Sequence, residues 1–347
     1  MNNSPLKPAL IIWGGIDVGS KSFDACFCQR SQEPTAAASL RNLPAAHYPR
    51  TRQGAAQFAQ QLPAGCMRVA MESTGRYSLE LAWWLKELLP GLEISIVNPR
   101  RIADYARSLG LRNKTDRLDA AVIASYGAER QPAAWSPWDD CWQSLQSLSR
   151  TRQSLAESKT RHGNQLADLM RAQLPAPVRG QLMDGLGAVI QSLQEQIKAI
   201  NKAMEALLAH HLELAAQAQL LDTIPGVGPV VAMGLLGELG DLRRFGARKA
   251  LETFAGMNVG VKQSGTCLNQ TRGLSKEGSR RVRRLLFLAA MAATKGDNSF
   301  ATFYKRLVAR GKKKKVALGA VMRKLLNVMR QVTITAKQYD NAKVSMS

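Results

Sequence analysis

Two short apolar runs near the start of the chain each end at an acidic residue. Residues 10–16 lead into Asp17, and Arg68–Met71 lead into Glu72. Short apolar runs bounded by glycine or polar residues are typical of strands, and a carboxylate at the end of a buried strand is held on rigid backbone. The pattern therefore predicts an α/β domain that carries acidic side chains at an edge of its sheet.

The first 137 residues alternate between strand and helix patterns. We expect a three-stranded meander first, then a helix, the strand that ends at Glu72, a helix stopped by Pro90–Gly91, a strand and a helical segment running past Asp119. This is the element order of a ribonuclease-H-like fold. Besides the two runs above, the expected strands are Phe23–Gln29, Thr35–Leu40 and Glu93–Val97, and the expected helices are Gly54–Leu62 and Leu79–Leu89.

The composition changes over residues 138–219, which we assign to a helical coiled-coil linker. β-branched residues become few, and a proline-rich break at Leu174–Pro177 separates two helical stretches. Apolar positions follow one another at spacings of three and four, as in a coiled-coil seam. An intramolecular spacer and a dimer-forming seam remain equally open, because the seam covers only about two heptads. Its positions are Leu193, Ile197, Ile200, Met204 and Leu207.

Residues 220–347 form the expected C-terminal domain and carry most of the positive charge. The chain has a formal charge of +22 and a pI near 10.2, and Arg243–Arg330 holds 22 Lys and Arg against three acids. A surplus of this size predicts a polyanionic partner, either nucleic acid or an anionic membrane surface. No apolar stretch approaches the 18 residues of a membrane span, so we expect nucleic acid and no membrane.

The cysteines and the first apolar run bear on the compartment. Five cysteines are an odd number without a Cys-x-x-Cys pair, which favours reduced, structural thiols. The first apolar run is short, enters Gly14–Gly15 and lacks a cleavage pattern, so we interpret it as a strand rather than a signal peptide. We expect a cytoplasmic protein.

Four carboxylates in a basic protein predict a metal site. Asp116 and Asp119 are three residues apart and share one helix face, beside the strand-end acids Asp17 and Glu72. Acids this close raise one another's pKa unless a divalent cation offsets their charge, and Mg²⁺ prefers such oxygen ligands. Two Mg²⁺ ions would serve phosphate chemistry. Singly, each acid is more simply a cap or a surface charge, and Asp24 competes for the first position.

The segment from Leu221 to Val230 matches a helix-hairpin-helix element. Its glycines, Gly226 and Gly228, leave backbone N–H groups exposed at a helix N-terminus, where they suit a phosphate. A plain tight turn between two packed helices is the alternative.

Basic clusters give the remaining nucleic-acid candidates. Runs of this kind are commonly solvated faces, but few acids lie near them, so we expect them to follow a phosphate backbone. Trp135 and Trp138 are more consistent with packing than with base stacking. The candidate cations are Arg112, Lys114, Arg280, Arg281, Arg284, Lys312, Lys313, Lys314, Lys315, Arg323 and Lys324.

The motifs together resemble a known family, the DEDD transposases of the insertion sequences one-ten and eleven-eleven, which include the pilin-gene-inverting recombinases. The resemblance covers nearly the whole chain. The motifs that carry it are Ile16-Asp17, Met71-Glu72-Ser73-Thr74-Gly75, Val97-Asn98-Pro99, Gly110 to Asp116 with Asp119, Ile224 to Gly228, Phe254-Ala255-Gly256, Gln263-Ser264-Gly265 and Gly311 to Val316 leading into Met322 to Leu325.

The resemblance implies more than the residues alone indicate. It implies a RuvC-like domain, a coiled coil and a transposase domain whose nucleophilic serine maps to Ser264; Thr266, Ser275 and Ser279 are nearby hydroxyls that composition does not distinguish from it. It also implies a covalent phosphoserine, donor and target double-stranded DNA, a structured guide RNA encoded by the element and a homo-oligomer, from dimer to tetramer.

Three functions follow from this sequence. The first is an RNA-guided, Mg²⁺-dependent DNA recombinase that moves its own insertion sequence through a Holliday-junction-like intermediate. The second is a hydrolytic junction nuclease that uses only the four carboxylates. The third is a nucleic-acid-binding protein without activity.

Overall fold

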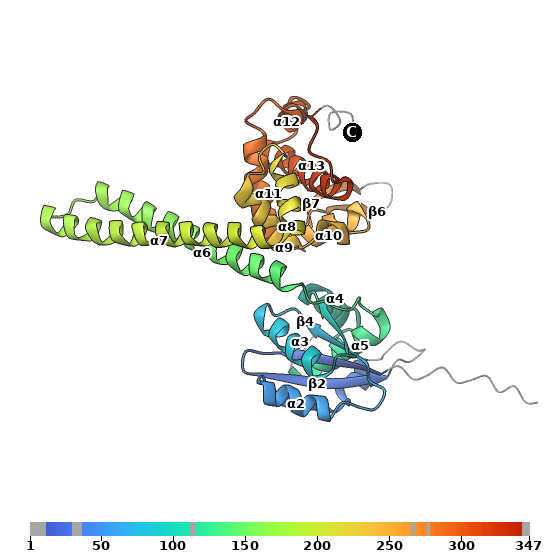
Figure 1. Ribbon diagram of the computed structural model, residues 1–347. Helices are drawn as coiled ribbons and strands as arrows, with labels where there is room; N and C mark the ends of the chain where they lie inside the picture. Colours follow the sequence, from blue (N-terminus) through green and yellow to red (C-terminus); the bar gives the residue numbers. More distant parts are fainter. Residues whose placement is uncertain (1–11, 30–36, 112–115, 265–267, 276–277, 342–347) are drawn as a thin grey trace, which may run out of the picture. The chain divides into compact units, whose positions relative to one another are not determined.

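The computed structural model describes residues 12–29, 37–111, 116–264, 268–275 and 278–341. The chain forms two compact units, one up to Pro137 and the other from Trp138 onward (Figure 1). The helical segment 138–219 and the C-terminal segment belong to the same unit. The division between them at residue 220 stays a prediction.

The first unit is built on a mixed five-stranded sheet of order β3-β2-β1-β4-β5. β1, β2 and β3 are antiparallel neighbours, whereas β4 and β5 run parallel to β1. Apart from the short helix that separates the second strand from the third, the elements follow the order expected from the sequence for a ribonuclease-H-like fold. The elements are β1 (Ile12–Val18), β2 (Ser22–Gln29), α1 (Ala37–Arg41), β3 (Ala45–Pro49), α2 (Arg52–Gln60), β4 (Arg68–Glu72), α3 (Arg76–Leu88), β5 (Glu93–Val97), α4 (Pro99–Ser108) and α5 (Asp116–Arg130).

The expected third strand at Thr35–Leu40 is wrong. Where the structure describes this segment it forms the short helix α1, and the third strand lies later, at Ala45–Pro49. Three consecutive alanines favour a helix, because alanine has the highest helix propensity. The true strand carries Tyr48, which is buried and stacks on Phe23 of β2 with ring centroids 5.1 Å apart. An aromatic cross-strand pair of this kind stabilises the sheet.

Two apolar clusters cover the two faces of the sheet. Side chains alternate between faces along β1, so Trp13 faces α5 while Ile16 packs with Phe58 of α2 and Leu81 of α3. The approach of α5 to β1 is very close at Gly15. A Cβ there would lie 2.1 Å from the backbone nitrogen of Ala124, so only glycine allows this helix to lie directly on the strand.

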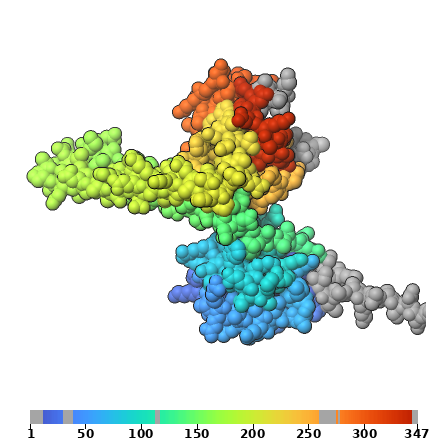
Figure 2. Space-filling view, in the orientation of Figure 1, coloured from blue at the N-terminus to red at the C-terminus, as the bar shows by residue number. Residues whose placement is uncertain are grey.

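The second unit begins with two long helices joined at the predicted proline break. α6 (Asp140–Arg171) and α7 (Ala176–His210) pack along each other as a helical hairpin, and the end of this hairpin projects beyond the helices that follow (Figure 2). The positions predicted as a seam are the buried or half-buried ones in this part of α7. Met204 is fully buried, and Ile200 and Leu207 pack against the core of the unit. The seam therefore contributes to packing within the chain.

The rest of the second unit is a helical bundle with one small β-hairpin. Its apolar core joins residues from every part of the bundle, including Leu145 of α6 and Met204 of α7. The elements are α8 (Leu212–Asp222), α9 (Pro229–Leu239), the 3₁₀ turn η1 (Leu242–Arg244), α10 (Arg248–Ala255), β6 (Val259–Ser264), β7 (Leu268–Leu274), α11 (Arg280–Ala293), α12 (Ser299–Ala309) and α13 (Lys314–Thr335).

The base of the helical hairpin is fixed to α9 by polar contacts. Arg150 donates from Nε and Nη2 to the two carboxylate oxygens of Glu238, at 2.7 and 3.0 Å. Gln146 donates to the backbone oxygen of Gly237 at 3.0 Å. A Cβ at Gly237 would lie 3.1 Å from the Cα of Gln146, so the helices approach closely here.

Candidate active site

A row of polar side chains crosses the sheet at the carboxyl end of β1. The register pairs Asp17 with Asp24 of β2, and Asp24 with His47 of β3. On the other side Ile16 is level with Met71, so Asp17 and Glu72 follow at the ends of two neighbouring parallel strands. Cross-strand partners point to the same face, so the sheet gathers these residues in one row.

The row lies on the face of the sheet that α5 covers. Trp13 and Gly15, which alternate with Asp17 along β1, both contact α5. Gly127 meets the ring of Trp13, whereas Ala120 and Ala124 meet Gly15, so α5 runs in the opposite direction to β1. Continued by one helical turn, this path brings the start of α5 to Asp17. The predicted helical acids therefore belong to the same end of the sheet as the strand acids.

A pocket at this edge contains two of the four predicted carboxylates. Glu72 and Asp119 both line it, with Arg100 and Arg107 of α4 on its rim and a volume of about 450 Å³. Asn98, the residue after β5, caps α4 by accepting from the backbone N–H of Arg100 at 2.9 Å. A pocket with two carboxylates and two arginines presents both signs of charge to a ligand. This combination is suited to a phosphate group.

The remaining predicted ligands are only partly described. Asp116 begins α5, but its side chain lies outside the described residues, as do Arg112 and Lys114. Within the part of the chain that the structure describes, no three His, Cys, Asp or Glu side chains are grouped closely enough to hold a metal ion. The four predicted ligands are nevertheless all carboxylates, and carboxylate oxygens are the ligands of a hard cation, so their chemistry fits Mg²⁺.

Sequence reasoning considered Asp24 only as a competitor of Asp17 and gave His47 no role. Asp24 is buried, with 8% of its surface exposed, and Nδ1 of His47 lies 3.1 and 3.2 Å from its two carboxylate oxygens. The ring nitrogen donates to the carboxylate, so the buried Asp24 has a hydrogen-bond partner. Only the strand register reveals this pair, because the two residues are 23 positions apart.

The cysteines nearest the site are unsuited to ligation. Burial raises the pKa of the Cys26 thiol to about 11, with a smaller contribution from neighbouring Cys28. Burial also raises the pKa values of Cys28 and Cys66. Thiols of high pKa stay protonated and do not bind metals well. The described cysteines form no disulfide, as predicted; they are Cys26, Cys28, Cys66 and Cys141.

Ser264 lies at the end of a strand in the second unit. β6 ends at Ser264, which is paired with Leu268, the first residue of β7. The side chain of Ser264 lies outside the described residues. The backbone thus places this residue at the end of one strand of an antiparallel pair.

Several of the cations predicted to contact nucleic acid also interact with other side chains of the second unit. Arg284 forms an ion pair with Glu157 of α6, and Arg281 lies 4.0 Å from the buried carboxylate of Glu238. Arg323 lies 3.8 Å from the buried Glu252, and the ammonium of Lys324 lies 4.9 Å from the ring centre of Phe303. These four cations contribute to packing, which leaves less of their charge for an external partner.

The four consecutive lysines before and within α13 behave differently. Lys312 to Lys315 are all exposed, and Lys314 and Lys315 occupy the first turn of α13, which contains no acid. The N-terminus of a helix carries a partial positive charge, so these lysines destabilise the helix that they begin. An exposed cluster that opposes its own helix dipole is expected to have an anionic partner. Arg280 is likewise exposed, at the start of α11.

The predicted helix-hairpin-helix turn joins α8 and α9. Gly226 has a φ of +83°, and a Cβ there would lie 2.3 Å from the backbone oxygen of Ala289 in α11. This glycine is therefore required for packing. Gly228 is exposed, has no neighbour within 4 Å and precedes the first turn of α9. Of the two glycines, Gly228 is the one whose surroundings leave room for a phosphate.

The two tryptophans near the boundary between the units pack as expected. Trp135 contacts the first core and meets Trp83 edge to face, with ring centres 5.7 Å apart. Trp138 packs against Gly240, with the guanidinium of Arg244 5.6 Å from its ring centre.

No described helix has the length and apolar character that a membrane span requires.

Two protein-family models match different parts of this chain. The DEDD transposase model of the IS110 group, described as "Transposase", matches residues 14–175, and the model described as "Transposase IS116/IS110/IS902 family" matches residues 218–305. The transposase for insertion sequence element IS1111A of Coxiella burnetii is 26% identical over 251 residues, which are 67% of this chain and 66% of that protein.

Two further comparisons concern the whole chain and the first unit. A RuvC structure from Thermus thermophilus covers 36% of this chain and 99% of its own at 15% identity, with a TM-score of only 0.25. The pilin gene-inverting protein of Moraxella bovis is 30% identical over 334 residues, which are 94% of this chain and 97% of that protein. On the strength of this match and of the two family models, the chain belongs to the IS110 family of transposases.

Proposed function

We propose that this protein is the recombinase of an insertion sequence, which cuts and rejoins DNA with Mg²⁺-binding carboxylates in one unit and a serine nucleophile in the other. The observation that carries the proposal is the convergence of strand-end and helical acids at one edge of the sheet. Family membership supplies the reaction class, because a transposase must cleave and transfer DNA strands.

The carboxylates are the proposed ligands of two Mg²⁺ ions. Asp17 and Glu72 are fixed by neighbouring strands, and Asp119 shares a pocket with Glu72. Asp116 starts the same helix as Asp119. When bound, Mg²⁺ stabilises charge on phosphate oxygens and lowers the pKa of an oxygen nucleophile. The chain's own part is to hold the ligands on rigid elements and to bind the phosphate with nearby cations.

Ser264 is the proposed nucleophile. Its hydroxyl oxygen forms an ester bond to a DNA phosphorus while a bond from that phosphorus to a sugar oxygen breaks. The serine loses its proton, and the departing sugar hydroxyl gains one. A phosphate ester is present before and after the step, so a sugar hydroxyl of another strand reverses it without an external energy source. Such exchange through a Holliday-junction-like intermediate is the proposed reaction.

The partners follow from charge and from the relatives. The exposed lysines of α13 suit the phosphates of donor and target double-stranded DNA. A structured RNA encoded by the element is the proposed source of target choice, and a dimer or tetramer is the proposed assembly. Sequencing of RNA that copurifies with the native protein tests the guide. Recovery of no discrete RNA would instead favour an inversion system in which the protein itself reads the DNA sites.

The serine is tested by trapping the covalent intermediate on a nicked suicide substrate. Ser264→Ala is expected to abolish the protein–DNA adduct and strand exchange while DNA binding is unchanged. Asp119→Asn is expected to abolish both reactions as well. Ser275→Ala, a matched loss of a hydroxyl in the same region, is expected to behave as wild type.

The same substrates separate the proposal from the alternatives. A hydrolytic nuclease would release cut DNA without an adduct in the wild type. A binding protein without activity would retain its behaviour in Asp119→Asn and without Mg²⁺. Adducts that persist in Ser264→Ala would assign the nucleophile to another residue and overturn the role proposed for Ser264.

A further inference from the structure

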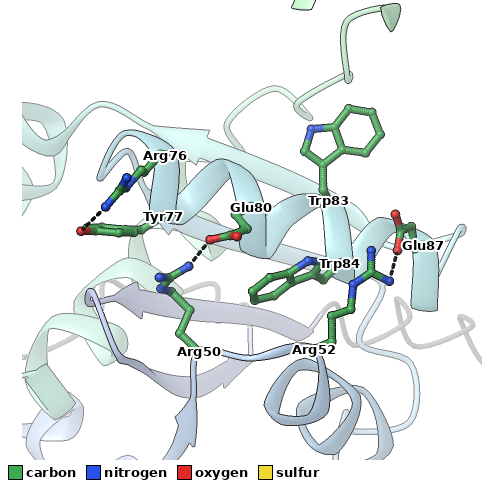
Figure 3. A pocket seen from close by; sticks show the side chains of 8 residues that line it. All are labelled: Arg50, Arg52, Arg76, Tyr77, Glu80, Trp83, Trp84 and Glu87. Atoms are coloured by element: carbon green, nitrogen blue, oxygen red, sulfur yellow. Dashed lines mark hydrogen bonds and ion pairs between the residues drawn. The ribbon is translucent and has the colours of Figure 1, made fainter. Parts of the chain in front are cut away.

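A groove on the first unit has no role in the site described above. It lies between α3 and the junction of β3 and α2, and has a volume of about 540 Å³. α3 packs on the face of the sheet opposite to the one that α5 covers. The groove therefore belongs to a different face of the first unit from the carboxylates. Its polar and aromatic lining is shown in Figure 3.

One stripe of α3 forms a wall of the groove. Its side chains alternate between aromatic and acidic at spacings of three and four residues, which places them on one helix face. The first ring is followed by an acid, the indole of Trp84 and a second acid. The members of this stripe are Tyr77, Glu80, Trp84 and Glu87.

Two arginines from the opposite wall neutralise both acids. Arg50 forms an ion pair with Glu80, and Arg52 forms one with Glu87 at 2.9 Å. The guanidinium of Arg50 is fixed further, because it donates to the backbone oxygen of Ser20 at 2.9 and 2.8 Å. Figure 3 shows the indole of Trp84 between these two ion pairs. Its ring is therefore bordered by fixed polar groups.

Positive charge remains at the open end of the groove. Arg76 is exposed, and its side chain donates to the hydroxyl of Tyr77 at 3.3 Å. Arg50 approaches the ring of Tyr77 from another direction, with its guanidinium 4.5 Å from the ring centre. With three arginines against two paired glutamates, the lining has an excess cation beside an aromatic ring.

The ring of Tyr77 is covered by two guanidinium groups, those of Arg50 and Arg76, which lie 4.5 and 5.0 Å from its centre, so the indole of Trp84 is the ring left for a base. We propose that this groove binds an unpaired nucleotide of a single-stranded nucleic acid, with the base on the ring of Trp84 and the phosphate at Arg76 or Arg52. Aromatic rings beside arginines are the usual means of holding unpaired bases, since every base has a face that stacks. A volume of about 540 Å³ is within the range of small-ligand sites. The inference rests on the proposed function only in taking nucleic acid as the partner.

The test uses the full-length protein in EDTA, so that no cleavage takes place. A single-stranded oligonucleotide carrying one 5-iodouracil is irradiated with the protein, and the labelled tryptic peptides are identified by mass spectrometry. Trypsin releases Tyr77–Lys86 as one peptide, which contains Tyr77, Trp83 and Trp84. Label on this peptide is the expected result. DNA and RNA oligonucleotides of the same sequence are compared, and the better-labelling one identifies the natural strand.

Matched variants distinguish the groove from general attraction by a basic protein. Arg52→Gln lies outside the labelled peptide, so a fall in labelling cannot come from loss of the labelled ring. The Arg52 side chain is 72% exposed, so we expect the variant to fold as wild type, which thermal unfolding checks. We expect a fall of about fivefold or more. Arg68→Gln is the control, because Arg68 also pairs with a glutamate, Glu93, but lies outside the groove. We expect it to label as wild type, and Trp84→Phe to retain labelling.

Three outcomes would overturn the inference. One is absence of label on Tyr77–Lys86 with both oligonucleotides, and another is equal labelling in Arg52→Gln and Arg68→Gln. The third is equal labelling by a duplex, in which the bases are not available for stacking. A failure of the proposed recombination can be distinguished from a failure of this inference, because Asp119→Asn should abolish strand exchange but leave this labelling unchanged.

Discussion

The two units of this protein differ most in how they use acidic residues. Residues 1–137 contain 16 Lys and Arg against 11 Asp and Glu, a net charge of +5, whereas residues 138–347 contain 32 against 15, a net charge of +17. In the first unit acids gather at the ends of strands, beside a pocket. In the second unit the buried acids Glu238 and Glu252 instead lie among arginines.

This difference separates the proposed metal chemistry from the proposed polyanion binding. A cation site needs several carboxylates on rigid elements, and the end of the sheet in the first unit provides such positions. A surface for phosphates needs exposed cations, and the second unit leaves Lys312 to Lys315 exposed at a helix end. The proposed serine belongs to the basic unit, so DNA held there would present its phosphate to the serine.

The largest effect is expected from a substitution that displaces α5, the helix that carries Asp119, from β1. Gly15→Ala places a Cβ 2.1 and 2.2 Å from backbone atoms of Ala124 and Ala120, which cannot rotate away. We expect the first unit to lose about 3 kcal/mol or more of stability as α5 is displaced from β1. Denaturant unfolding of the full chain, followed by hydrogen exchange of the backbone amides in β1 and α5, measures this loss.

The same substitution in the helical hairpin should have the opposite sign. Gly185 is exposed in the interior of α7, and a Cβ there meets nothing within 4 Å. Gly185→Ala should therefore stabilise the second unit by about 1 kcal/mol through helix propensity. Equal effects of the two variants would mean that α5 does not depend on close contact with β1.

Gly15 also shows what the sequence predicts and what it leaves out. The strands that end at Asp17 and Glu72 follow from their apolar pattern, and both were predicted correctly. The glycine that allows α5 to approach has no local signal, because its reason is a helix more than 100 residues later. Asp24 was considered only as a competitor to Asp17, and the register instead makes it the direct neighbour.

The second prediction concerns the acids of the basic unit. Glu238 is 95% buried at its side chain and is bound by Arg150 through two hydrogen bonds. Glu238→Gln leaves that guanidinium facing an amide, and we expect a loss of about 2 kcal/mol in the stability of the second unit. Thermal or urea unfolding measures the loss, with loosening of the hairpin base seen by hydrogen exchange in α6 and α9.

Glu213→Gln is the matched control for this change. Glu213 pairs with Arg243 at 2.5 Å, but its side chain is 74% exposed. Exposed ion pairs contribute about 1 kcal/mol or less, so this variant should change stability by less than the first. If Glu238→Gln were as mild as Glu213→Gln, the buried pair would not be what fixes the hairpin to the bundle.

Several of the arginines predicted to contact nucleic acid also form ion pairs within the second unit. Basic runs predict a charged surface, but the partner of each arginine is set by tertiary contacts. Arg284 meets Glu157, and Arg323 lies near Glu252. The two members of the first pair are more than 120 residues apart, so no local pattern reveals them. Lys314 and Lys315 are different, because their conflict with the helix dipole is visible from the sequence once the start of α13 is known.

The third prediction separates binding from stability at these lysines. Replacement of Lys314 and Lys315 by alanine removes two cations from the first turn of α13, where they oppose the dipole. We expect the second unit to become more stable by about 0.3–1 kcal/mol for each lysine. DNA affinity should fall, and the slope of log K against log salt should decrease in magnitude by about 2. Titrations over a range of salt concentration measure this.

Two lysines elsewhere in the same unit provide the control. Lys198 and Lys202 are exposed in the middle of α7, far from either helix end in the sequence. Their double replacement by alanine removes the same charge, but we expect little change in stability or in the salt slope. An equal fall in slope for both pairs would mean that DNA binding follows net charge rather than the α13 cluster.

The smallest expected effect is a pH dependence near the hairpin base. Burial raises the pKa of Asp241, but hydrogen bonds and charge from Arg243 outweigh it and hold that pKa below its ordinary value. The side chain also caps the turn η1, because it accepts from the backbone N–H of Arg243 at 2.8 Å. A carboxyl whose pKa is lower in the folded state stabilises the fold above its unfolded pKa, near 3.9, and that contribution is lost as the pH falls through the folded pKa.

Two substitutions at Asp241 separate its charge from its capping role. Asparagine caps as well as aspartate, so Asp241→Asn should remove the acid dependence together with the stabilisation that the charge gives at neutral pH. Asp241→Ala should cost about 1 kcal/mol more at neutral pH, because it also removes the cap. Unfolding midpoints between pH 3 and pH 7 measure both. An unchanged pH dependence in Asp241→Asn would mean that another group, and not the Asp241 carboxylate, causes the loss of stability in acid. The contrast between the two units would then rest only on the buried acids of the second unit, Glu238 and Glu252, which lie among arginines.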